Sequence, residues 1–202
     1  MTENPFLISD WWEIPPNHLS AFLDWHDEPY RAGFARKPNV QRLYAIDGRP
    51  DAHLSWNEFN AGAGADEKAS LPAGWPGSEG AVSHQRFRCK LMRDVGHKPH
   101  LPAPWLYIVH TDIPDYIVDE YNAWYDEEHL PRLVTVPGIL RARRYVAQGA
   151  NPRYLTAYDL TDRDAFESPA GLKARKTPWT EKMRSLFFNT RRSMALLVKY
   201  DS

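Results

Sequence analysis

The chain is poor in cysteine, in net charge and in long apolar runs, and each shortage excludes a class of protein. The single cysteine, Cys89, excludes an intramolecular disulfide and a cysteine-based zinc cluster, and we expect it to be a small core residue. With a formal net charge of −1 and scattered basic residues, the chain lacks the clustered basic surface that a nucleic acid requires. No apolar run of about 18 residues and no basic-then-apolar leader occurs, so we expect no membrane span, no export and a cytoplasmic protein.

The common cofactor and nucleophile motifs are also absent. There is no GxGxxG after a strand, no phosphate-binding loop and no HExxH. Without GxSxG or an activating partner for Cys89, acyl-transfer chemistry is disfavoured. We therefore expect no cofactor and no metal. The histidines show no triad spacing, although four of them could still converge on iron or zinc with a nearby carboxylate; these are His26, His84, His110 and His129.

The main positive feature is an internal repeat. A helix-to-strand segment around Trp25 and Pro38 recurs around Trp124 and Pro137, and subtracting 25 from 124 or 38 from 137 gives 99 each time. Upstream, the same register matches 5–15 with 104–114 without a gap. Because repeats decide the architecture, we predict two tandem units. Their expected bounds are 1–96 and 103–202, with a stiff linker at 97–102.

The second unit has the clearer pattern of secondary structure. Apolar periodicity and breakers predict, in order, a strand at 104–112, a helix from 115 to about 129, strands at 138–146 and 154–160, helices at 162–176 and 179–189, and a strand at 193–200. The order βαββαβ is the ferredoxin-like layout, an antiparallel sheet with helices on one face.

The first unit is less regular after its shared segment. We expect short strands near His53 to Phe59 and from His84 to Met92. Between them, residues 60–80 carry five glycines and two prolines, which is typical of a loop. Such a loop could be a lid over a pocket or the remnant of a decayed second helix.

Two segments of the second unit resemble a known superfamily. They are EYNAWYDEEHLP with the following VPGI, from Glu120 onward, and YLTAYDL with the following SPA and PWT, from Tyr154 onward. Both are similar to the dimeric α+β barrel superfamily in its EthD-like branch. The resemblance implies an α+β fold in which two ferredoxin-like units pack sheet to sheet as a barrel, here as tandem repeats within one chain. It does not fix a reaction, because relatives include polyketide cyclases, muconolactone isomerase, anthrone oxygenases and haem-binding enzymes.

A candidate acid/base group lies on the helix from residue 115. His129 follows Tyr125 by four residues and Tyr121 by eight, so the three share one face. Partial burial there would favour a neutral imidazole able to accept a proton, with Asp126 orienting it and Tyr125 donating to a substrate oxygen. Alternatively, His129 caps the helix C-terminus and the tyrosines are ordinary core. The EthD-like resemblance, in which a histidine recurs at this position, favours the catalytic reading.

The first unit offers a second candidate catalytic site, in which the histidine and the tyrosine have exchanged positions. His26 is equivalent to Tyr125, and Tyr30 is equivalent to His129. We expect one asymmetric active site and favour the second unit for it.

The aromatic content, 13% of the chain, suggests a cavity for a flat ligand, although the rings could simply fill the core. The candidate substrate-binding residues are Tyr121, Trp124, Tyr30, Trp11, Trp12, Tyr107, His110, Trp56 and His84.

The sequence thus predicts a cofactor-independent acid/base enzyme, of lyase, isomerase or cyclase type, acting on a small aromatic or polycyclic molecule. The partner is that small molecule, with no nucleic acid and no membrane, and a homodimer stays open. The alternatives are a non-catalytic protein that binds a hydrophobic ligand, or a haem or metal enzyme on the same barrel.

Overall fold

A computed structural model describes residues 5–34, 37–60, 83–98 and 100–201. Contacts divide the chain into two compact units, 1–88 with 198–202, and 89–197. The loop expected at 60–80 lies, apart from its first residue, outside the described residues. No helix in the described ranges is long and apolar enough to cross a membrane.

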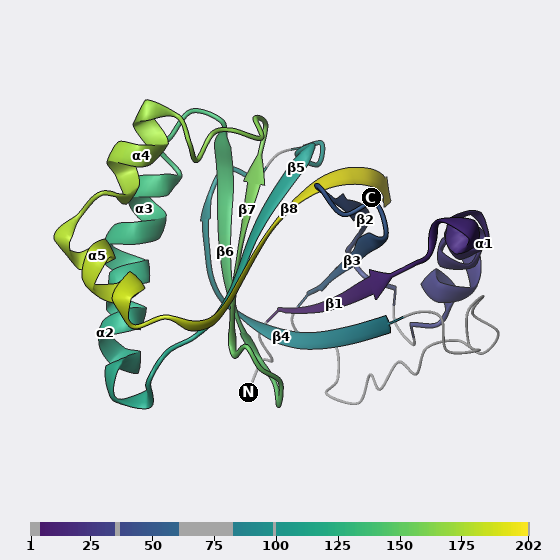
Figure 1. Cartoon of the computed structure of the whole chain (residues 1–202), viewed down its shortest axis with the longest axis horizontal. Helices are drawn as coiled ribbons and strands as arrows, with labels where there is room; N and C mark the ends of the chain where they lie inside the picture. The colour runs from purple at the N-terminus through teal and green to yellow at the C-terminus, as the bar shows by residue number, and fades with distance from the viewer. Residues whose placement is uncertain (1–4, 35–36, 61–82, 99, 202) are drawn as a thin grey trace. The chain divides into compact units, whose positions relative to one another are not determined.

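In its described residues, the first unit has three paired strands, one helical segment and parts of two further strands (Figure 1). Its elements are β1 (Phe6–Glu13), η1 (Pro16–His18), α1 (Leu19–Trp25), η2 (His26–Tyr30), β2 (Val40–Ile46), β3 (Ala52–Phe59) and the beginning of β4 (Ser83–Gly96). Strand β3 pairs antiparallel with both β1 and β2. The strands expected from the sequence near residues 53–59 and 84–92 are therefore confirmed, as β3 and β4.

The helical segment of the first unit covers one face of its sheet. Alternate residues of β1 point to that face, because side chains in a strand alternate with a period of two. Among them, Ile8 and Trp12 join a buried cluster with Phe22, Trp25 and Tyr30 from the helical segment. This packing holds η2 against the sheet.

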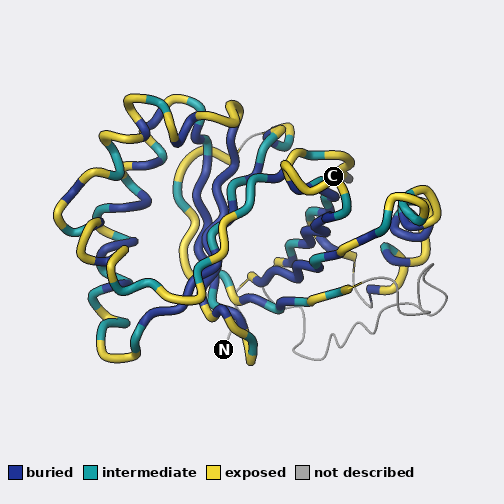
Figure 2. The backbone as a smooth tube through the Cα atoms, in the orientation of Figure 1, coloured by how far each residue is buried: buried dark blue, intermediate teal, exposed yellow. Residues whose placement is uncertain are grey.

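The second unit has the complete ferredoxin-like set of elements. These are β5 (Trp105–Asp112), η3 (Asp115–Ile117), α2 (Val118–Ala123), η4 (Trp124–His129), α3 (Leu130–Leu133), β6 (Ile139–Ala147), β7 (Tyr154–Leu160), α4 (Pro169–Arg175), α5 (Pro178–Ser185) and β8 (Phe188–Asp201). The strands are hydrogen-bonded in the order β8-β5-β7-β6, with β4 beside β6. The helices lie on one face of this sheet, and β7 is buried along its whole length (Figures 1 and 2).

Two of the helices expected from the sequence are wrong in extent. The helix expected at 162–176 is only α4, because Asp162 forms a turn by accepting a bond from the Asp164 amide and Ser168 caps the helix ahead of Pro169. The helix expected at 179–189 ends at Ser185, and Asn189 already belongs to β8. By contrast, the strand expected at 154–160 is found with those bounds.

The fold class agrees with the sequence prediction. The strand order β1-β3-β2-β8-β5-β7-β6-β4 closes into an antiparallel barrel within one chain, with helices outside the sheet, which is an α+β fold. Elements also recur at the repeat distance: β5, α2 and β6 begin at residues 105, 118 and 139, each 99 after β1, α1 and β2 at 6, 19 and 40. Comparisons between the units can therefore be made residue by residue.

Candidate active site

Both units contain a π-helix at the same place, directly after their first α-helix. It is η2 in the first unit and η4 in the second. A proline lies in or just after each one, at positions 29 and 131, and the missing N–H of proline removes a helical hydrogen bond. Wide turns of this kind often occur at functional sites. In the second unit the wide turn carries Trp124, Tyr125 and His129.

His129 is a buried, neutral imidazole. Its ring is 6% exposed and stacks on Trp124 with ring centroids 4.2 Å apart, while Tyr125 meets its edge at 5.3 Å. Burial, and to a lesser degree the positive charges of Arg184 and Arg175, lower the pKa of His129 to about 3. Its Nδ1 has no hydrogen-bond partner among the described residues. The ring is therefore unprotonated at neutral pH.

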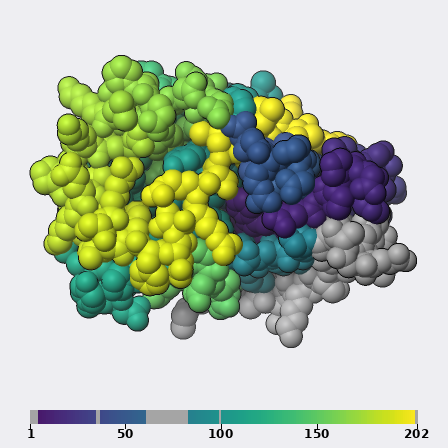
Figure 3. Space-filling model, viewed as in Figure 1, coloured from purple at the N-terminus to yellow at the C-terminus, as the bar shows by residue number. Residues whose placement is uncertain are grey.

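A small cavity adjoins this imidazole, between the sheet and the helices of the second unit. Its volume is about 30 Å³, which is room for about one water molecule. The cavity is lined by Tyr107, Val109, Trp124, Tyr125, His129, Tyr158, Phe166, Arg175, Arg184, Phe187 and Arg192. Figure 3 shows the segment that contains α4 and α5, in green to yellow, exposed at the left of the view.

Two of the residues that line the cavity are tyrosines with buried hydroxyl groups, Tyr125 and Tyr158. Tyr125 Oη accepts a hydrogen bond from Thr156 Oγ1 at 3.1 Å, so its own proton remains for another acceptor. Burial raises the pKa of Tyr158 well above its usual value, which keeps this phenol protonated. Both groups can therefore act as hydrogen-bond donors to a substrate oxygen.

Three arginines give the cavity an excess of positive charge. Arg175 donates to the Glu167 carboxylate at 3.1 Å and to the Phe166 carbonyl at 2.6 Å. Arg184 and Arg192 lie at the exposed rim, and their guanidinium groups have no hydrogen bond or ion pair to any residue that the structure describes. Partial burial and the neighbouring Arg175 and Arg192 lower the pKa of Arg184. An anion is the ligand that would relieve this repulsion.

The structure brings four of the expected second-unit residues together at the cavity and separates three others from it. Tyr107, Trp124, Tyr125 and His129 line it. Asp126 instead lies 3.8 Å from Arg93, and in the described chain no hydrogen bond joins it to His129. The orienting role expected for Asp126 thus has no support in the geometry.

Two other expected second-unit residues lie away from the cavity. Tyr121 is completely buried, with the Arg144 guanidinium 4.5 Å from its ring centre. His110 is buried as well, and it alternates with Val109 along β5, so it faces the other side of the sheet. Neither contributes to the cavity lining.

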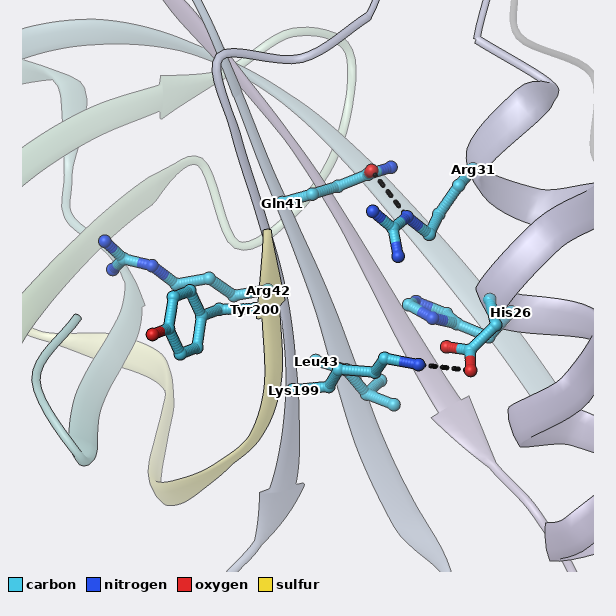
Figure 4. Close-up of a pocket in the computed structure, with 8 residues that line it drawn as sticks. His26, Arg31, Gln41, Arg42, Leu43, Lys199 and Tyr200 are labelled. Atoms are coloured by element: carbon cyan, nitrogen blue, oxygen red, sulfur yellow. Dashed lines mark hydrogen bonds and ion pairs between the residues drawn. The ribbon is translucent and has the colours of Figure 1, made fainter. Parts of the chain in front are cut away.

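His26, the alternative catalytic residue of the first unit, borders a smaller pocket (Figure 4). The volume of this pocket is about 10 Å³. His26 Nε2 is 2.9 Å from Ser55 Oγ, and burial lowers the pKa of His26 to about 4. Arg31 and Gln41 are joined across the pocket at 3.1 Å, and Lys199 is paired with Asp27. Most of the charged groups of this pocket are thus already paired with one another or with neighbouring side chains.

The remaining expected residues of the first unit belong to a buried polar network or to the strands beside it. Tyr30 donates to Asp10 at 2.5 Å, and His84 Nε2 is 2.6 Å from the same carboxylate. The His84 ring stacks on Trp12 with centroids 4.2 Å apart. Trp56, which is fully buried in β3, donates to Glu58 at 2.8 Å. Trp11 alternates with Trp12 along β1 and so faces the opposite side of the sheet.

Sequence reasoning missed the charged residues of both units. The missed residues are Asp10, Arg86, Arg175, Arg184 and Arg192. A signal existed for Asp10, because a lone carboxylate in the apolar strand FLISDWWE requires a partner when buried. The arginines gave no such signal, since isolated basic residues in a sequence are typical of solvated surface.

In the residues that the structure describes, no group of three or more His, Cys, Asp or Glu side chains is placed to hold a metal ion. No protein-family model and no curated protein matches this chain.

Solved structures do match the fold. A proposed monooxygenase from Lactobacillus acidophilus NCFM is 9% identical, with a TM-score of 0.65 over 99% of this chain and 97% of that one. An anthrone oxidase-like protein is 10% identical, with a TM-score of 0.62 over 99% and 94%. A haem-degrading enzyme from Listeria monocytogenes is 10% identical, with a TM-score of 0.55 over 96% and 99%. At such identities the likeness shows the fold alone, and function must be argued from the site.

Proposed function

We propose that the chain is a cofactor-independent acid/base enzyme that moves a proton next to the carbonyl group of an aromatic substrate. The observation that carries the proposal is the neutral, buried His129 beside a cavity with phenol donors and guanidinium groups. Proton abstraction needs a base, an oxygen-directed donor and stabilisation of the charge that develops, and these side chains can supply all three.

In the proposed step, the cavity-facing nitrogen of His129 takes a proton from the carbon beside the carbonyl. The electron pair of the C–H bond moves to the carbonyl oxygen, which becomes an enolate. Tyr125 and Tyr158 donate hydrogen bonds to that oxygen and stabilise its negative charge. The imidazolium then returns the proton to another atom, as in an isomerase, or to a leaving oxygen, as in a lyase.

With a pKa of about 3, His129 is a weak base in the free protein, so the proposed step depends on the negative charge that develops on the bound substrate. Burial and the charges of Arg184 and Arg175 lower this pKa in the free protein. A negative charge that develops beside the ring favours the imidazolium and offsets those arginines. The basicity of His129 would therefore increase during the reaction.

The same cavity does not fit haem, the group suggested by one neighbour of the same fold. Its 30 Å³ holds about one water molecule, and one face of the His129 ring is covered by Trp124. A porphyrin could not reach this imidazole without displacing the surrounding aromatic side chains.

Proton exchange tests the proposal directly. Anthrone is a suitable first probe because it is an enolisable aromatic ketone and one neighbour is described as anthrone oxidase-like. Deuterium uptake at the carbon beside the carbonyl, followed by NMR in D₂O for a panel of such ketones, should be accelerated by the protein. His129→Gln should slow the accelerated rate roughly 10²-fold to 10⁴-fold, as expected for loss of a general base.

His26→Gln is the matched control from the first unit and should leave the exchange rate unchanged. If His26→Gln slows the exchange and His129→Gln does not, the active site lies in the first unit. If the unmodified protein accelerates exchange for no ketone of the panel, a protein that only binds its ligand becomes the better explanation.

A further inference from the structure

The two units place different residues at one equivalent strand position. Asp10 of β1 corresponds to Val109 of β5, because subtracting 10 from 109 gives 99. Their surroundings match: Asp10 pairs across the sheet with Ser55, and Val109 pairs with Thr156. In each unit that hydroxyl residue contacts the equivalent residue of the π-helix, at 2.9 Å between Ser55 and His26 and at 3.1 Å between Thr156 and Tyr125.

In the first unit the Asp10 carboxylate fills the space between sheet and helix. It is fully buried, and it accepts hydrogen bonds from Tyr30 at 2.5 Å and from Arg86 at 2.6 and 2.9 Å. Burial alone would raise its pKa, but hydrogen bonds from His84 and Arg86 lower it. The first unit therefore contains a carboxylate that neutralises its own arginine.

The second unit also has arginines near this strand position, but it has Val109 in place of the carboxylate. Val109 lies directly across from Arg192 in the β5–β8 pairing, and both line the cavity with Arg184. Tyr30, which donates to Asp10 in the first unit, corresponds to His129. The second unit thus has basic groups and a polar ring around a position where the first unit has an anion.

We infer that the substrate is an aromatic acid whose carboxylate binds Arg192 and Arg184 beside Val109, the residue that corresponds to Asp10 of the first unit. Its ring would lie among the aromatic side chains of the cavity, chiefly Tyr107, Tyr158 and Phe166. Since Arg184 and Arg192 are exposed and unpaired in the described chain, their side chains can move aside to admit a ring larger than the present cavity.

This inference deepens the proposed function, because it concerns the same site, but it can be tested by binding alone. The probe is 2-naphthoate, with the uncharged 2-naphthamide as its matched control, titrated into the full-length protein by calorimetry. The naphthoate should bind at least about 10-fold more tightly than the amide, since a charge-assisted pair to arginine is available only to the acid.

Two substitutions locate the carboxylate. Val109→Asp copies the first unit and should weaken naphthoate binding roughly 10-fold to 100-fold, because the new carboxylate pairs with Arg192. Val109→Asn introduces a side chain of the same size as aspartate but without its charge, and should weaken naphthoate binding much less. Arg192→Gln, at an exposed position with little risk to the fold, should remove most of the preference for naphthoate over the amide. Equal affinity for acid and amide, no measurable naphthoate binding, or equal effects of Val109→Asp and Val109→Asn would overturn the inference.

The outcomes for the site and for the chemistry are separable. His129→Gln should retain naphthoate binding while losing proton exchange. Arginine-dependent binding of naphthoate without any exchange activity would refute the proposed reaction and leave the carboxylate site standing. If proton exchange depends on His129 but not on Arg192, and the protein does not prefer the acid to the amide, the carboxylate site is refuted and the proposed reaction stands.

Discussion

At the scale of residues, buried histidines make the stability of the protein dependent on pH. Burial lowers the pKa of His26 and His110 to about 4 and that of His129 to about 3, against 6.5 for an unperturbed histidine. Between these values the unfolded chain binds protons that the folded chain does not. The free energy of unfolding must therefore decrease as pH falls below about 6.5.

We expect this decrease to be roughly 1–2 kcal/mol per buried histidine between pH 7 and pH 5. Urea denaturation at the two pH values measures it. His110→Gln should shrink the difference by about one histidine's share, because glutamine does not titrate and His110 lies outside the proposed site. Asp10 does not interfere, since its lowered pKa places its titration below 3.8. A stability that is the same at both pH values would show that these rings are not held neutral.

Individual residues also show how far the sequence could predict the site. The spacing of Tyr125 and His129 was sufficient to place both at the cavity, because helical periodicity is a local property. Arg192 and Arg184 reach the same cavity from β8 and α5, more than 50 residues further along the chain. Only the tertiary fold brings them together, so no local pattern could reveal them.

At the scale of elements, α5 depends on a cap that also contacts the π-helix. Thr177 Oγ1 accepts a hydrogen bond from the Thr180 amide at 3.0 Å and donates to Glu128 Oε1 at 2.6 Å. Glu128 lies next to His129 in η4, and α5 carries Arg184. One hydroxyl therefore connects the element that holds the proposed base to the element that holds a rim arginine.

Thr177→Ala should lower the free energy of unfolding by about 1–2 kcal/mol, because both the cap and the bond to Glu128 are lost. Thr177→Ser keeps the hydroxyl and should cost much less. Chemical denaturation of the three proteins distinguishes them. If the alanine and serine variants are equally stable, the hydroxyl contributes nothing and the helix is held by packing alone.

The elements also show which parts of the fold were predictable. Strand β7 was predicted with its exact bounds because its seven residues are all buried and end at turn signals. Residues 162–168, the first part of the expected helix at 162–176, are not helical because Ser168 and Pro169 form a stronger helix start. That signal is present in the sequence but was outweighed by apolar periodicity. The sequence could not show that η4, which carries His129, packs against α5, which carries Arg184. Long-range contacts bring these two elements together.

At the scale of the whole molecule, the two units use the same position in opposite ways. The first closes it with the buried pair of Asp10 and Arg86, and the second leaves arginines without an internal anion. A pair that is buried and hydrogen-bonded offers no open position to a ligand, and removing one of its partners leaves an uncompensated buried charge. We therefore assign a structural role to the network of the first unit and the chemistry to the second.

Asp10→Asn tests this division of roles. The amide cannot neutralise Arg86, so the free energy of unfolding should decrease by about 2–4 kcal/mol, somewhat less than for a fully buried pair because the Arg86 side chain is 22% exposed. Glu13→Gln is the control from the same strand: its pair with Arg49 is about half exposed, and its loss should cost less than about 1 kcal/mol. Proton exchange at saturating ketone should remain unchanged in both variants while they are folded. If Asp10→Asn stays folded but loses exchange, the first unit takes part in the chemistry, and the assignment of the site to the second unit alone is wrong.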